Sequence, residues 1–133
     1  MTNDVITLTV PARGEYAKSV RMTAAELASR IGMSYDEVDD VRMAADEAFV
    51  FAAGCLDETA SITFEFEVTG DGLAISVGPF PYSAEYAEGA APGGYAAFIL
   101  ESVCDEFSLE RGENTCTLRA VRRVALRSGD AGA

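Results

Sequence analysis

The stretch AADEAFVFAAG, Ala44 to Gly54, carries the first acid that could do chemistry in this chain, Glu47. Helical spacing puts Asp40, Ala44, Glu47 and Phe51 on one side of a helix, next to an apolar stripe. A carboxylate at the edge of a core is either solvated or part of a site, and the spacing alone favours solvation. Glu47 is therefore a candidate catalytic residue that needs a second observation.

The second candidate is the glycine pair Gly93–Gly94 in APGGY. Glycines directly before a helix let the backbone approach a ligand, and a helix N-terminus favours phosphate. These two residues are therefore candidates for cofactor binding. A Gly-Gly pair is more often a simple turn, however, and neither GxxxxGK[ST] nor GxGxxG occurs anywhere in the chain.

The elements that must position these residues follow from the periodicity of the apolar residues. Alternating residues predict strands at 5–12, 61–69 and 73–78, and a hairpin around RGEN within 106–126. Helical spacing predicts helices at 15–31, 34–54 and 95–107. Ser34 and Glu37 have the capping-box arrangement at the start of the second helix. Residues 79–94, rich in Pro, Gly and Ala, are expected to form a long loop.

This element order predicts an α+β fold: a two-layer α/β sandwich with about three helices on one face of a mostly antiparallel sheet. Residues 1–125 are expected to form one domain, and 126–133 a flexible tail. No apolar run is long enough to cross a membrane, and the N-terminus lacks the features of a secretion signal. The expected compartment is the cytoplasm.

The amino-acid composition disfavours several kinds of partner and of catalytic chemistry. The net charge of −12 disfavours direct binding to nucleic acid or to an anionic membrane, and suits either solubility alone or a partner with a basic face. Histidine is absent, which removes histidine base catalysis and histidine metal ligation. The three cysteines, Cys55, Cys104 and Cys116, have no CxxC spacing and are expected to be reduced core thiols, so no metal site is expected.

Two long runs carry a family resemblance. The run from VPARGEY through SYDEVDDVRMAADEAFVFAAG resembles the N-terminal half of the RsbW-type anti-sigma factors, which are serine-protein kinases with the GHKL ATPase fold. GGYAAFILESVCDEF resembles that family's glycine-rich lid and the following helix. The resemblance covers about residues 5–124 in the same element order. It implies a histidine-kinase-type ATPase fold, and partners that are a sigma factor, an anti-anti-sigma protein or both.

The nucleotide motifs depart from the family pattern. In the family's E-x-x-x-N motif, Glu positions water and Asn holds magnesium; here Glu47 matches the Glu, but Phe51 replaces the Asn. A phenyl ring cannot ligate a hard cation. The adenine-reading Asp has no counterpart at Gly78 or Pro79, and the lid keeps only Gly93 and Gly94. Glu47 is thus interpreted as vestigial, and magnesium and ATP as binding weakly or not at all.

The sequence is compatible with three functions. The first is a regulator of the anti-sigma type that acts by binding, as a homodimer, with Phe51, Phe80 and Tyr82 filling the former nucleotide cavity. The second is an active serine/threonine kinase with a non-standard ATP site, which would need a replacement magnesium ligand from Asp40, Asp46 or Glu47. The third is a sensor whose 79–94 loop closes over a small apolar ligand.

Overall fold

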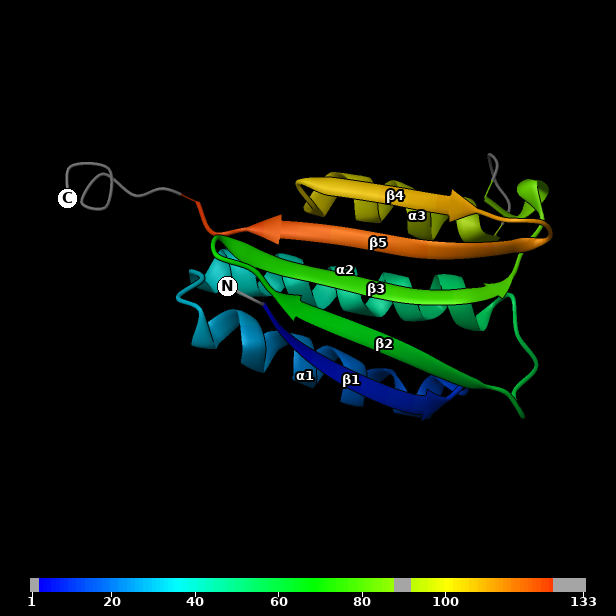
Figure 1. Cartoon of the computed structure of the whole chain (residues 1–133), viewed down its shortest axis with the longest axis horizontal. Helices are drawn as coiled ribbons and strands as arrows, with labels where there is room; N and C mark the ends of the chain where they lie inside the picture. The colour runs from blue at the N-terminus through cyan, green and yellow to red at the C-terminus, as the bar shows by residue number, and fades with distance from the viewer. Residues whose placement is uncertain (1–2, 88–91, 126–133) are drawn as a thin grey trace.

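The protein, described by a computed structural model over residues 3–87 and 92–125, has two layers, with a sheet on one side and helices on the other (Figure 1). The strands are β1 Asp4–Pro11, β2 Ser61–Val68, β3 Gly72–Pro81, β4 Glu106–Arg111 and β5 Thr115–Arg123. The α-helices are α1 Ala17–Arg30, α2 Tyr35–Ala53 and α3 Pro92–Val103, with short 3-10 helices η1 Gly14–Tyr16 and η2 Ala84–Ala87. The α+β sandwich with three helices on one face is confirmed.

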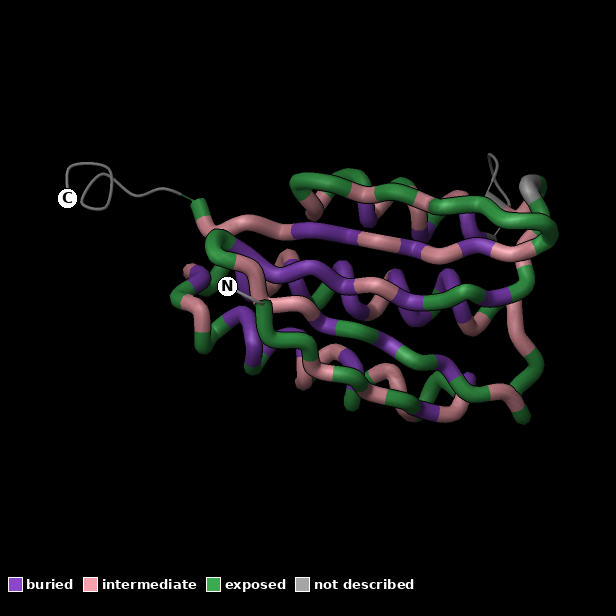
Figure 2. The backbone as a smooth tube through the Cα atoms, viewed as in Figure 1, coloured by how far each residue is buried: buried purple, intermediate pink, exposed green. Residues whose placement is uncertain are grey.

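The five strands form one antiparallel sheet in the order β1-β2-β3-β5-β4. Its register aligns one row across all five strands: Ile6, Phe66, Ile75, Ala120 and Phe107. Alternation along each strand turns such rows toward the helices and leaves the intervening residues on the open face. The alternating colours along β2 in Figure 2 follow this pattern.

The helices lie side by side over the sheet, with α2 between α1 and α3 (Figure 1). Arg21 of α1 bonds Asp46 of α2 at 3.0 Å on one flank. Small residues on α2, including Ala44, Ala45 and Ala48, are almost fully buried, which lets its neighbours approach closely. As the central helix, α2 therefore packs against α1, α3, β3 and β5.

Polar groups fasten the first turns of α2. Ser34 accepts a bond from the Glu37 amide, and the Glu37 carboxylate accepts from the amides of Ser34 (2.7 Å) and Ala125 (2.5 Å). This confirms the capping box and extends it to the chain segment after β5. One turn on, Asp40 accepts from Arg122 at 3.2 Å, and the same guanidinium also reaches Asp105.

The three cysteines pack in or against the core, and no disulfide joins them. Cys116 is fully buried, while Cys55 and Cys104 are half-buried. Burial raises the pKa of the Cys116 thiol to about 11 and that of Cys104 to about 12. Both thiols are therefore protonated at neutral pH, as expected of core thiols rather than reactive ones.

The expectation of one long loop at 79–94 was wrong in part. β3 skips a step at Gly78–Pro79 and then pairs again with β5 at Phe80, so this strand continues to Pro81. The third helix begins at Pro92, three residues earlier than expected, since proline suits the first turn of a helix. It also ends earlier, at Val103, and Phe107 belongs to β4. Residues 88–91 and the expected tail, 126–133, lie outside the described residues.

In the described part of the chain, no helix is both long and apolar enough to span a bilayer.

Candidate nucleotide site

Phe51 stands in the last turns of α2 and is completely buried. Its ring meets those of Phe80, Tyr82 and Tyr86 at centroid distances of 5.9, 6.0 and 5.1 Å. Aromatic pairs at such distances each contribute about 0.5–1.5 kcal/mol beyond the burial of their area. The position next to Glu47 on this face of α2 is thus the centre of an aromatic cluster, defined here as Phe51, Phe80, Tyr82 and Tyr86.

Tyr86, on η2, ties this cluster to the end of α2. Its hydroxyl donates to the Phe51 carbonyl oxygen at 2.9 Å, which satisfies one of the backbone carbonyls that a helix end leaves open. Burial, with the neighbouring Cys55 second, raises the pKa of Tyr86 to about 12. The hydroxyl therefore remains a donor throughout the physiological range.

Gly93 is buried in the first turn of α3, under the same tyrosine. A Cβ on Gly93 would overlap the Tyr86 ring and lie 2.8 Å from the Tyr86 carbonyl oxygen. A Cβ on Gly54, just after α2, would overlap the Tyr86 hydroxyl. The structure thus brings Phe51 and Gly93 together around Tyr86, and both glycines make room for that side chain. Gly94, the other expected ligand-binding glycine, follows as a half-buried residue of α3.

Glu47 lies one turn before Phe51, half-buried on α2. Burial raises the pKa of its carboxyl group, and the nearby Asp46 raises it further. Within residues 3–87 and 92–125, Glu47 makes no hydrogen bond or ion pair. The structure therefore places it near the aromatic cluster but gives it no partner there.

The remaining acids of α2 that could replace a magnesium ligand are already engaged. Asp40 binds Arg122 and Asp46 binds Arg21. No group of three or more acidic or cysteine side chains able to hold a metal ion occurs in the described residues. Magnesium in nucleotide sites is held by one or two protein oxygen ligands together with phosphates and water, and Phe51 offers no oxygen where the family has its Asn.

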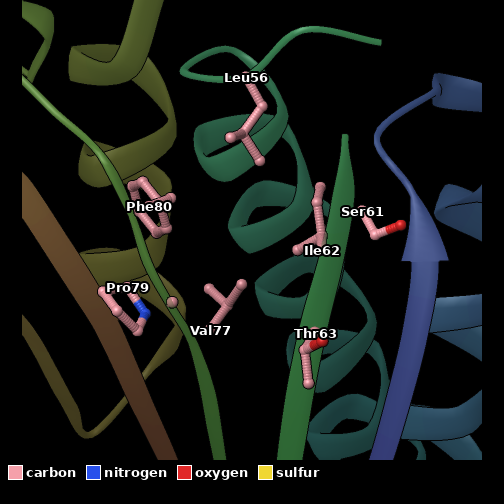
Figure 3. A pocket seen from close by; sticks show the side chains of 8 residues that line it. Leu56, Ser61, Ile62, Thr63, Val77, Pro79 and Phe80 are labelled. Carbon is pink, nitrogen blue, oxygen red and sulfur yellow. The ribbon is translucent and has the colours of Figure 1, made fainter. Parts of the chain in front are cut away.

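A cavity of about 180 Å³ lies close to the aromatic cluster, between β2 and β3 (Figure 3). It opens where β2 and β3 stop pairing, beyond Phe64 and Val77. Its lining is mainly apolar, with two hydroxyl side chains on β2: Leu56, Ser61, Ile62, Thr63, Val77, Gly78, Pro79 and Phe80. Sites for drug-sized ligands occupy about 300–1,000 Å³, so this cavity is smaller than a typical ligand site.

Residues 10–122 match the family model of the histidine kinase-like ATPase domain. The chain belongs to this family. Its relatives include the serine-protein kinase RsbW of Bacillus licheniformis, 30% identical over 125 residues that cover 80% of this chain and 78% of the relative. RsbW of Listeria innocua is 31% identical over 126 residues, covering 80% of each chain. The RsbW resemblance inferred from the sequence is thereby confirmed.

A solved structure supports the fold independently. The crystal structure of the RsbU and RsbW domains of a Mycobacterium tuberculosis protein superposes with a TM-score of 0.70 and 18% identity. The match covers 91% of this RsbW-like chain and 32% of the larger one. At this identity the likeness establishes the fold alone, and the function has to be argued from the residues of the site.

Sequence reasoning proposed Phe51, Phe80 and Tyr82 as fillers of the nucleotide cavity, and these three rings do lie together. It gave Tyr86 no such role. The available signal was the glycines in GGY and FAAG, since a glycine at a helix end is compatible with a close approach of another group as well as with a simple turn. Which side chain comes close depends on how η2 folds back, and the spacing does not encode that.

Proposed function

We propose that this RsbW-like chain is a regulator of the anti-sigma type that acts by binding other proteins and does not use ATP. One observation carries the proposal: Phe51, at the position of the family's magnesium-binding Asn, is fully buried in the aromatic cluster. A side chain so enclosed is part of the core. It cannot be exchanged for a metal and a triphosphate without dismantling that end of α2.

The physical requirement for kinase activity strengthens the proposal. Phosphoryl transfer depends on a metal that neutralises the phosphates and on groups that position them. Phe51 offers neither, and Gly78 and Pro79 bring no carboxylate to read an adenine. The glycine that would approach phosphate, Gly93, is covered by Tyr86. The family's contacts to magnesium, to adenine and from the lid are thus all changed in this chain.

The alternative, an active serine/threonine kinase with a non-standard site, depends on Glu47. This acid is retained and has no ion-pair partner in the described part of the chain. Its raised pKa, however, reflects an environment that disfavours the charged form needed next to a metal. With Asp40 and Asp46 already paired, a single carboxylate would have to hold the ion, which argues for the binding role.

The proposed partners are a sigma factor, an anti-anti-sigma protein or both, in the cytoplasm, with no direct contact to nucleic acid or membrane. The acidic net charge suits a partner with basic faces. We also propose a homodimer formed through β1 and α1. β1 is an edge strand whose outer side has no neighbour in the sheet, and Val5 and Met22 are exposed on these two elements. Light scattering that shows only monomer over the micromolar range would contradict the dimer.

The test is affinity purification of the tagged chain from its native host, with and without ATP, followed by mass spectrometric identification. We expect a sigma factor or an anti-anti-sigma protein to co-purify equally in both conditions, without phosphorylated serine on the partner. Recovery that requires ATP, or a partner phosphorylated in vitro by the purified chain, would favour the kinase.

A further inference from the structure

Besides Tyr35 in the first turn of α2, the described residues of α2 and α3 expose four large apolar side chains to solvent. Met43 and Val50 on α2 are each 51% exposed, and Tyr95 and Phe98 on α3 are 70% and 67% exposed. Met43 and Val50 are two turns apart, and Tyr95 and Phe98 one turn apart, so each pair shares a helix face. These four residues are called the α2–α3 surface below.

The two helices run antiparallel and lie side by side over the sheet. Near the end of α2, Tyr86 bonds the Phe51 carbonyl and covers Gly93 at the start of α3. Near the start of α2, Asp40 shares Arg122 with Asp105, which follows α3. Neighbouring antiparallel helices leave a groove along their contact, and a third helix can pack its ridge of side chains into such a groove.

The charges of this surface are acidic and uncompensated. Glu47 lies between Met43 and Val50 on α2, and Glu101 lies one turn beyond Phe98 on α3. α3 contains no basic residue, and Arg42, the single basic residue of α2, bonds Asp39. Neither glutamate has an ion-pair partner among the described residues.

We propose that the α2–α3 surface is the docking site for an amphipathic helix of a partner protein, one that carries Lys or Arg beside its apolar face. Apolar anchors at helical spacing are what a helix laid in a groove requires. The acidic groups select a basic helix. A second copy of this chain seated face to face on this surface would oppose Glu47 and Glu101 to the same acids. The inference rests on the proposed binding function, but concerns a surface separate from the aromatic cluster.

The probe is a synthetic amphipathic helix of leucine and lysine, with a leucine–glutamate peptide as its charge-reversed counterpart. Titration of the full chain is followed by NMR in low salt. We expect saturable shifts confined to α2 and α3 with the lysine peptide and none with the glutamate peptide. Salt should weaken the binding.

Variants locate the site. The double substitution Tyr95→Ser and Phe98→Ser should weaken the lysine peptide at least tenfold, and Glu47→Gln with Glu101→Gln several-fold. Glu58→Gln, at an exposed acid in the loop after α2, is the control and should bind as the unchanged chain does. All these side chains are at least partly exposed, and thermal unfolding confirms that each variant is folded.

The proposal would be overturned if the double serine variant bound the lysine peptide as tightly as the control does. It would also be overturned if the NMR shifts were centred on other elements, or if both peptides bound equally. Concentration-dependent self-association abolished by Phe98→Ser would also overturn it, by making a second copy the occupant. The titration contains no nucleotide, so ATP binding by the chain would contradict the proposed function and leave this result standing.

Discussion

At its first turns α2 is held by Ser34, Glu37 and Asp40, and at its last turns by the rings around Phe51. The bonds at the first turns are directional and link charged or polar groups to backbone amides and to Arg122. The contacts at the last turns are apolar and depend on shape, with one hydroxyl, that of Tyr86, closing the helix end. The same helix is thus fastened by two different kinds of chemistry.

The two ends of α2 differ in the oxygen ligands that they offer. The polar end has oxygen atoms, but internal donors already occupy Glu37 and Asp40. The aromatic end, where the family places its nucleotide, offers rings in place of oxygen ligands. Under the proposed function, the nucleotide site is lost at one end of α2 and is not rebuilt at the other.

Phe51→Ala should lower the free energy of unfolding by about 3–5 kcal/mol, because it empties the centre of the aromatic cluster. Urea denaturation measures the change. Val50→Ala, the adjacent but half-exposed position, is the control and should stay within about 0.5 kcal/mol of the unchanged chain. Similar losses for the two variants would show that the cluster is not part of the core.

Gly93→Ala should cost about 2 kcal/mol through overlap with Tyr86. The sign is informative, since Gly→Ala within a helix ordinarily stabilises. Gly14→Ala, where a Cβ would have open space, should be near neutral in the same thermal unfolding assay. In a Tyr86→Ala background the cost of Gly93→Ala should fall, and only the part due to the Tyr86 carbonyl oxygen, 2.8 Å from the added Cβ, should remain. A cost that is unchanged in that background would mean that the tyrosine ring is not what Gly93 makes room for.

Arg122→Ala should cost about 1–2 kcal/mol, because it leaves Asp40 and Asp105 without their shared cation. The three side chains are partly exposed, so the loss stays below that of a fully buried pair. Arg42→Ala, which breaks only the exposed pair with Asp39, should change stability by less than about 0.5 kcal/mol. Chemical denaturation of both variants in one buffer makes the comparison. Equal losses of stability in the two variants would show that the bonds of Arg122 to Asp40 and Asp105 contribute no more than an exposed ion pair.

Tyr86→Phe should cost about 1 kcal/mol at neutral pH, the value of one hydrogen bond. The pKa of Tyr86 is raised from 10 to about 12 in the fold. Its contribution is therefore complete below pH 10 and is lost as the pH rises towards 12. Urea midpoints over alkaline pH should fall more steeply for the unchanged chain than for Tyr86→Phe. Parallel curves would mean that the pKa of the Tyr86 hydroxyl is the same in the folded and the unfolded chain.

Much of the fold could be predicted from the sequence because its signals are local. The alternation in SITFEFEV and the Ser34–Glu37 box each specify an element without knowledge of the rest of the chain. The continuation of β3 to Pro81 could not be predicted, since it depends on β5 resuming the pairing after Gly78–Pro79. Proline punctuates strands in most contexts, and here tertiary pairing overrides that tendency.

In the candidate site, too, some features could be predicted from the sequence and others could not. The replacement of the family's Asn by Phe51 can be read directly, and it led to the aromatic filling of this end of α2. The covering of Gly93 by Tyr86 could not be read, because it depends on the path of η2 back to the end of α2. The assignments of Glu47, Gly93 and Gly94 as traces of a nucleotide site stay predictions.

Calorimetric titration of the purified chain with magnesium and ATP tests the central claim most directly, with an RsbW kinase that binds ATP as positive control. We predict no saturable binding up to millimolar nucleotide, because Phe51 occupies the metal position and Tyr86 covers Gly93. Phe51→Asn, checked for folding, shows whether that residue alone is responsible. Micromolar binding of magnesium-ATP by the unchanged chain would contradict the account.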